Sequence, residues 1–229
     1  MIKPVVVVVA HPDDEVLGCG GTIALMGRVG RPVHVLITAD GLSSRGKNGI
    51  TNANEDFLKQ RNDAATKACQ LMGCESVELL DLPDNRLDSI DLLDIVKIVE
   101  SFIQKFKPET VLTHHNGDVN IDHRIIHDAV IAACRPQPGF CVNELLFFEV
   151  PSSTEWRPPG SGIAFSPNWF VDISETLDIK LAALQQYKDE LRDFPHPRSL
   201  EAVESLARWR GASVGVNAAE AFVLGRKLL

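Results

Sequence analysis

The chain has 229 residues, 45% of them hydrophobic and 24% charged, which suits one large α/β domain with a substantial core. Its formal net charge of −8 at pH 7 argues against a nucleic-acid partner, because binding phosphates requires a basic face. No apolar stretch approaches the roughly 20 residues of a spanning helix, so we expect no membrane span. A strand pattern begins almost at the first residue, which predicts no signal peptide. The five cysteines lack paired spacing, so we expect them to be reduced and the protein to be cytoplasmic.

Residues 5–15 carry the most informative pattern in the chain. The five valines of 5–9 predict a strand buried on both faces, as in the centre of a parallel sheet. Pro12 cannot continue such a strand, so His11 and the acids at 13–15 belong to the loop at its C-terminal end. Ligands of open α/β sheets bind at that edge. We therefore predict a metal site with a catalytic carboxylate beside it.

Helix capping is the alternative interpretation of the acids at 13–15. Carboxylates are favoured near a helix N-terminus, and an apolar run that begins at Ile23 indicates that a helix follows closely. Capping accounts for one or two acids but assigns no role to His11 or to three consecutive acids. Crowded like charges cost free energy unless a cation neutralises them. The metal site is the stronger interpretation.

Strand and helix patterns alternate along the rest of the chain. Further strands are predicted at 33–38, 77–80, 110–113, 145–150 and 169–173, helices at 20–29, 55–72, 90–106, 122–134, 174–191 and 200–209, and either a short strand or irregular structure at 214–224. This order predicts an α/β fold: a three-layer α/β/α sandwich around a Rossmann-like, mostly parallel sheet. The polar loop at 40–54 follows a strand and suits substrate binding.

A second cluster of polar residues, 114–123, follows the strand predicted at 110–113 and therefore lies on the same sheet edge as His11. The helix after it places His123 in its first turn. Catalytic zinc takes three protein ligands and leaves a fourth position for water. His11, one aspartate of the pair 13–14 and a residue of this second cluster would supply them. The remaining carboxylate would accept the proton of the metal-bound water.

The sequence resembles the PIG-L (LmbE-like) family. The similarity rests on the run His-Pro-Asp-Asp-Glu at 11–15, the Gly-Gly-Thr at 20–22 and the Asp-His at 122–123, and it covers the N-terminal two-thirds of the chain. The resemblance implies a zinc-dependent N-deacetylase that acts on N-acetylglucosamine-containing and related amino-sugar substrates.

That resemblance also implies roles for individual residues. His11, Asp14 and His123 would hold Zn²⁺, with Fe²⁺ as the alternative because a site of two histidines and one aspartate accepts both. Asp13 would be the general base. Arg61 stands where the family carries an arginine near the substrate, and the alternative for it is a solvated surface charge.

One residue departs from the family pattern. Many members carry a histidine where this chain has Asn120, and asparagine can donate a hydrogen bond to an oxyanion but cannot deliver a proton. We expect His196, held between two prolines, to protonate the leaving amine, with His115 as the second candidate. The alternative for His115 and its neighbour His114 is to brace the loop. Asp122 would orient whichever histidine is used.

The expected protein is a single deacetylase domain over 1–229. Residues 1–150 would form the Rossmann-like core with the metal site, and 151–229 would complete the pocket for a small-molecule N-acetylated amino sugar or its conjugate. An amidase acting on a thiol conjugate or another acyl-amine remains open. A Rossmann-type nucleotide-binding protein is suggested by the glycines of 18–21, whose spacing does not match the dinucleotide fingerprint. Apolar residues on the last helices leave a homo-oligomer open.

Overall fold

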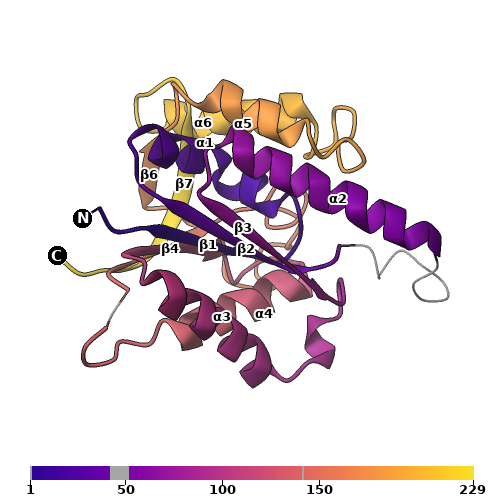
Figure 1. Cartoon of the computed structure of the whole chain (residues 1–229). Coiled ribbons are helices and arrows are strands. Elements are labelled where there is room, and N and C mark those ends of the chain that lie inside the picture. Colours follow the sequence, from indigo (N-terminus) through magenta and orange to yellow (C-terminus); the bar gives the residue numbers. More distant parts are fainter. Residues whose placement is uncertain (1, 42–51, 141) are drawn as a thin grey trace.

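One sheet of seven strands organises the chain in a computed structural model that describes residues 2–41, 52–140 and 142–229 (Figure 1). The strands are β1 (Val5–Val9), β2 (Val33–Ala39), β3 (Ser76–Leu82), β4 (Thr110–His114), β5 (Glu144–Phe148), β6 (Trp169–Asp172) and β7 (Ala219–Lys227). Their order across the sheet is β3-β2-β1-β4-β5-β7-β6. The loop predicted at 40–54 falls mostly outside the described residues.

Five of the strands are parallel. In β1, Val7 pairs with Val35 of β2 on one side and with Leu112 of β4 on the other, so the valine run lies at the centre of the sheet. β7 runs antiparallel to both β5 and β6. The mostly parallel, Rossmann-like sheet is therefore confirmed. The segment predicted as a short strand or irregular structure at 214–224 is irregular as far as Ala218 and then enters the nine-residue strand β7, which continues to Lys227.

Helices cover both faces of the sheet. They are α1 (Asp14–Arg28), α2 (Asn52–Leu71), α3 (Leu92–Phe106), α4 (Ile121–Ala133), α5 (Leu177–Leu184) and α6 (Leu200–Ala212), with a single 3₁₀ turn, η2 (Leu87–Ser89), before α3. Figure 1 shows α1, α2, α5 and α6 on one face and α3 and α4 on the other. The predicted three-layer sandwich is confirmed. No helix in the described part of the chain is long and apolar enough to cross a membrane.

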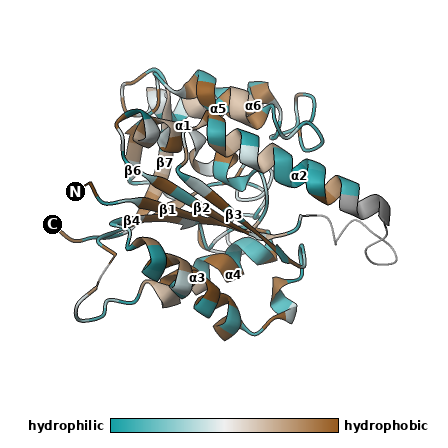
Figure 2. Cartoon of the chain, viewed as in Figure 1, coloured by the Kyte–Doolittle hydropathy of each residue, from teal (hydrophilic) through white to brown (hydrophobic). Residues whose placement is uncertain are grey.

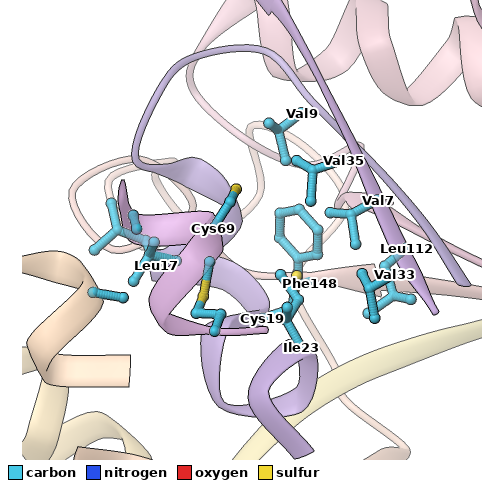
Figure 3. Close-up of a cluster of buried hydrophobic side chains, with 14 of the residues drawn as sticks. Val7, Val9, Leu17, Cys19, Ile23, Val33, Val35, Cys69, Leu112 and Phe148 are labelled. Atoms are coloured by element: carbon cyan, nitrogen blue, oxygen red, sulfur yellow. The ribbon is translucent and has the colours of Figure 1, made fainter. Parts of the chain in front are cut away.

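The two faces of β1 belong to two separate cores. Val5, Val7 and Val9 pack with α1 and α2, whereas Val6 and Val8 pack with α3 and α4, because successive side chains of a strand point to opposite faces. Figure 2 shows the central strands in hydrophobic colours between helices of mixed polarity. In the first core, the fully buried ring of Phe148 lies among Val7, Val35 and residues of α1 (Figure 3).

Every helix differs from its predicted bounds by at least one residue, and two of them, α1 and α5, differ most. α1 begins at Asp14 rather than at Gly20, because the carbonyl of Asp13 already accepts the N–H groups of Val16 (3.1 Å) and Leu17 (2.9 Å). The predicted helix at 174–191 is α5, which ends at Leu184. After it, Tyr187 donates its N–H to the carbonyl three residues back (3.0 Å), so the chain continues in turns.

A break at Cys19 (φ −148°, ψ 23°) divides α1 into two parts. A buried ion pair from the C-terminal half of the chain provides hydrogen-bond partners for the backbone groups at this break. Glu220 accepts the N–H groups of Gly21 (2.9 Å) and Thr22 (2.7 Å), which begin the second part. Lys180 donates to the carbonyl of Leu17 (2.9 Å) and to Glu220 (2.5 Å). Charges of the right sign therefore occupy both new helix ends.

The glycines of α1 serve close packing. A Cβ added at Gly18 would lie 2.2 Å from Cδ2 of Phe148, and one at Gly21 would lie 2.7 Å from Cδ1 of Ile173. Both neighbours are fully buried and have no room to move. The close approach of α1 to Phe148 of β5 and to Ile173 thus explains two of the glycines that suggested nucleotide binding.

Replacing Gly18 by alanine is expected to destabilise the fold by about 1–3 kcal/mol, because the added methyl group overpacks against Phe148. Gly20→Ala is the matched control, since its added Cβ would come no closer than 3.2 Å to a neighbouring atom, Sδ of Met72 or Cγ1 of Val16. Urea denaturation of both variants, compared at the transition midpoint, measures the difference. Equal midpoints for the two variants would contradict the tight packing of Gly18.

Candidate metal centre

Three buried side chains at the C-terminal edge of the sheet point to one place. His11 follows β1, Asp14 begins α1, and His123 lies in the first turn of α4. Nδ1 of His11 lies 3.2 Å from Nε2 of His123 and 3.3 Å from Oδ2 of Asp14, and the last two atoms are 3.3 Å apart. Ligand atoms about 2.0–2.1 Å from a tetrahedral metal lie about 3.3 Å from each other. The three donor atoms therefore fit a metal ion.

The chemistry of Asp14 also fits a cation. Its Oδ2 accepts the backbone N–H of His11 at 2.8 Å, but its Oδ1 is buried and has no hydrogen-bond partner within the described residues. A buried carboxylate oxygen without a partner is costly in a native protein. Burial alone would raise the pKa of Asp14, yet the facing histidines hold it well below its usual range. The carboxylate is thus ionised and ready to coordinate.

Each candidate histidine ligand has a carboxylate behind it. Nε2 of His11 lies 3.0 Å from Oδ2 of Asp122 and 3.1 Å from Oδ1 of Asp84, and Nδ1 of His123 lies 3.0 Å from Oδ2 of Asp118. Such partners fix the tautomer, so that the nitrogen without a proton would face a bound metal ion.

The supporting carboxylates are themselves fixed. Asp122 accepts the backbone N–H groups of Asn85 (2.7 Å) and Leu87 (3.0 Å). Asp122 also forms a second possible metal cluster with His11 and Asp84. However, its Oδ2 already contacts Nε2 of His11 and accepts the N–H of Asn85, so Asp122 acts in the described structure as a hydrogen-bond acceptor. Asp122 therefore orients His11.

Asp118 is held by the turn that follows β5. It accepts hydrogen bonds from the hydroxyls of Ser153 and Thr154, the latter at 2.8 Å, and from the backbone N–H of Asn120 at 2.8 Å. With these bonds, the pKa of Asp118 falls to about 2: burial opposes the shift, and the contact with His123 outweighs it. A charged Asp118 fixes the ring of His123.

Asp13 is the carboxylate beside the cluster, and its backbone is unusual. Its φ of 113° lies in the region that favours glycine. The side chain of Glu15 accepts the N–H of Asp13 (3.1 Å) and, at its other oxygen, the hydroxyl of the buried Tyr187. Burial raises the pKa of Glu15 to about 8, although the bond from Tyr187 lowers it. Glu15 and Tyr187 therefore hold the strained residue in place.

The side chain of Asp13 faces an arginine that no sequence pattern indicated. Nη1 of Arg198 lies 3.1 Å from Oδ2 of Asp13 and 3.2 Å from Glu190. Burial raises the pKa of Asp13 to about 6, although Arg198 opposes this shift. Arg61 lies 3.0 Å from the other oxygen of Glu190, and its side chain is only 10% exposed. Arg61 is thus buried in the described structure and linked to Asp13 through Glu190 and Arg198.

The remaining predicted site residues lie around this centre. Nε2 of His115 is 3.1 Å from the carbonyl of Ile163, and its ring contacts Phe165 at a centroid distance of 5.3 Å. Asn120 caps α4: its Oδ1 accepts the N–H of Asp122 (2.8 Å) and its Nδ2 donates to Asn85 (3.1 Å). The described contacts thus bind His115 to the 163–165 loop and use both side-chain ends of Asn120 within the fold.

His196 lies two residues before Arg198. Its Nδ1 accepts the backbone N–H of Arg198 at 3.1 Å, and its ring meets that of Trp156 edge-on at 5.7 Å. No contact of His196 with His11, Asp14 or His123 is present among the described residues.

Several residues of the centre were not assigned a role from the sequence. They are Asp84, Asp118, Tyr187, Glu190 and Arg198. Asp84 and Asp118 follow β3 and β4 at the same sheet edge as His11, so their positions in the sequence could have indicated that they belong to the site. The other three are distant in sequence from both motifs, and no local pattern marks them.

Comparison with known proteins gives the same picture. Residues 6–134 match the PIG-L family, described as GlcNAc-PI de-N-acetylase. The probable N-acetyl-alpha-D-glucosaminyl L-malate deacetylase 2 of Bacillus cereus is 30% identical over 193 residues, which cover 83% of this chain and 84% of that protein. The 4-oxalmesaconate hydratase of Pseudomonas putida is 30% identical over 202 residues, covering 80% and 72%.

A solved structure agrees over the whole chain. The conserved protein TT1542 from Thermus thermophilus superposes with a TM-score of 0.76 at 25% identity, covering 100% of this chain and 97% of that one. The matched family region contains all three candidate metal ligands, His11, Asp14 and His123. By its sequence and its fold, this chain belongs to the PIG-L family.

Proposed function

We propose that this protein is a metal-dependent N-deacetylase that hydrolyses the acetamido group of an N-acetylglucosamine-type sugar or its conjugate. The observation that carries the proposal is the buried carboxylate of Asp13 beside a triangle of donor atoms from His11, Asp14 and His123. The family match and the deacetylase relative from Bacillus cereus support the same reaction.

His11, Asp14 and His123 would hold the metal, which we propose to be Zn²⁺ with Fe²⁺ as the alternative. When bound, such an ion polarises the substrate carbonyl and lowers the pKa of the attacking water. The carboxylates of Asp122 and Asp118 keep the two histidines in the tautomers that this requires.

Asp13 acts as the general base. With a pKa of about 6, raised by burial, its carboxylate is mostly ionised at neutral pH and can still return a proton. Water adds to the acetyl carbon as Asp13 takes its proton. The C–N bond then breaks as the nitrogen receives a proton, giving acetate and a free amine.

Two groups can supply that last proton. Asp13 can return the one it accepted. His196 is the other candidate, and because its Nδ1 accepts the N–H of Arg198, the ring proton lies on Nε2, free to donate to the substrate. Asn120 is a weaker oxyanion donor than His196, since its Nδ2 already donates to Asn85.

The C-terminal part, 151–229, is proposed to complete the substrate pocket. It supplies Arg198 at Asp13 and Ser152, whose hydroxyl accepts the Nε–H of Arg198 at 2.6 Å. With Arg61, two guanidinium groups lie near the base and suit a substrate that also carries a carboxylate or another anion. His115 would act in substrate binding through the 163–165 loop that it supports.

Hydration of an unsaturated carboxylate is a second candidate function. It is favoured by the 30% identity to the Pseudomonas putida hydratase and by the two arginines near Asp13. An amidase acting on a thiol conjugate would use the same machinery as a deacetylase. The three functions can be separated by incubating the purified protein with N-acetylglucosamine, an N-acetylated thiol conjugate or an unsaturated dicarboxylate. Acetate release from one of the first two substrates would indicate a deacetylase or an amidase, and loss of the absorbance of the conjugated double bonds would indicate a hydratase.

Asp13→Asn is expected to keep its metal and to lose acetate release by about 10²–10⁴-fold, because the amide cannot accept a proton. Metal content and initial rates are measured on the same preparations. The exposed Asp178→Asn is the matched control and should keep full activity. In parallel, His196→Gln distinguishes the two proton sources, since unchanged kcat would leave that role to Asp13. Full activity of Asp13→Asn would rule out the proposed base.

Asp118→Asn is expected to weaken metal binding by about 10- to 100-fold, because His123 loses the carboxylate that fixes its ring. Competition against a chelator of known zinc affinity measures this change. His34→Gln is the control, since His34 lies in β2 and bonds with Ser76 instead. If Asp118→Asn bound the metal as tightly as wild type, the proposed ligand set would be wrong.

A further inference from the structure

The turn at 151–157 is tied to both sides of the metal centre. On one side the hydroxyl of Ser153 bonds to Asp118, the carboxylate behind His123. On the other, Ser152 accepts the Nε–H of Arg198, which contacts Asp13. Glu155 accepts the N–H groups of Ser152 (2.6 Å) and Ser153 (3.2 Å), so its carboxylate fixes the turn. The turn is therefore a rigid part of the site's border.

Trp156 is carried by this rigid turn but contributes little to the core. Its side chain is 52% exposed, although the neighbouring Arg157 reaches back to the carbonyl of Asp118 (3.4 Å). An indole that is half exposed on a fixed backbone presents a large apolar surface at low entropic cost. The fold itself does not use that surface.

The ring that Trp156 contacts is equally well fixed. His196 meets the indole edge-on, with an interplanar angle of 82°. The backbone N–H of His196 donates to the carbonyl of Asp193 (3.0 Å), and its Nδ1 accepts from Arg198 (3.1 Å). The proton of the neutral ring is thus on Nε2, available to a ligand. An exposed aromatic face therefore adjoins a positioned hydrogen-bond donor.

We propose that Trp156 and His196 form a carbohydrate-binding platform at the mouth of the metal centre. The apolar C–H face of a pyranose ring would pack on the indole, and a ring hydroxyl would accept the Nε2–H of His196, which leaves the return of the proton to the amine to Asp13. This inference rests on the proposed deacetylase function and identifies the part of the substrate that these residues recognise: the sugar ring, as distinct from the acetamido group at Asp13.

The contacts of residues close in sequence to Trp156 and His196 indicate that the platform lies near Asp13. Arg198 contacts Asp13 and lies two residues after His196, while Ser152 contacts Arg198 and lies four residues before Trp156. A sugar whose acetamido group reaches Asp13 would extend its ring past Arg198 toward these two side chains. The platform thus explains why an exposed tryptophan is held by a turn with several hydrogen bonds.

Kinetics of Trp156→Ala test the proposal. We expect KM for N-acetylglucosamine to rise about three- to tenfold, the range for loss of an aromatic contact, with little change in kcat or metal content. Trp209→Ala is the matched control, because Trp209 is 69% exposed on α6 and contacts no site residue among those described. Unchanged KM in Trp156→Ala, or an equal rise in both variants, would overturn the proposal.

A binding measurement separates this inference from the proposed reaction. The chain has three tryptophans, so N-acetylglucosamine should change the indole fluorescence of wild type and of Trp209→Phe but not of Trp156→Phe. If wild type releases no acetate but shows this Trp156-dependent signal, the platform stands and the deacetylase function fails. If wild type releases acetate and its fluorescence does not depend on Trp156, the platform fails. No acetate and no signal would overturn both.

Discussion

The crowding of buried carboxylates at one edge of the sheet is the constraint on which the rest of the structure depends. Six acidic side chains of the centre are buried: Asp13, Asp14, Glu15, Asp84, Asp118 and Asp122. Burial disfavours the charged form of each, and their mutual repulsion adds to that cost. The fold can keep them together only by giving each one a specific partner.

These acidic side chains have different partners, and their chemical properties differ accordingly. Asp122 and Asp118 face histidines and accept backbone or hydroxyl hydrogen bonds. Glu15 faces the hydroxyl of Tyr187, and burial raises its pKa to about 8, so it is largely neutral near pH 7. Asp14 alone keeps a buried oxygen with no partner in the described residues. The one carboxylate among the six that keeps an unsatisfied oxygen in the described structure is thus also a candidate metal ligand.

Most of the sheet and the first candidate metal ligands could be predicted from the sequence. Five valines in a row specify a central strand, and acids directly after it specify a polar edge, because both features are local. Asp13, however, adopts a φ of 113° that no local pattern predicts for aspartate. That conformation depends on Glu15 and on Tyr187, whose hydroxyl comes from 172 residues away. Arg198 and Glu190 escaped prediction for the same reason, since their contacts form only when α5 and the turns after it fold back over α1.

The two parts of α1 show how the distant half of the chain controls the motif. The break at Cys19 lets the first part carry Asp14 to the metal centre while the second part packs along the sheet. Lys180 and Glu220 stabilise that break by occupying the helix ends that it creates. The candidate donor atoms and the carboxylates that orient them therefore come from residues before 150, whereas residues beyond 150 support Asp118 and surround Asp13. Because the candidate ligands and the surroundings of Asp13 come from different segments, we expect substitutions after residue 150 to alter the surroundings of Asp13 while leaving the candidate metal ligands in place.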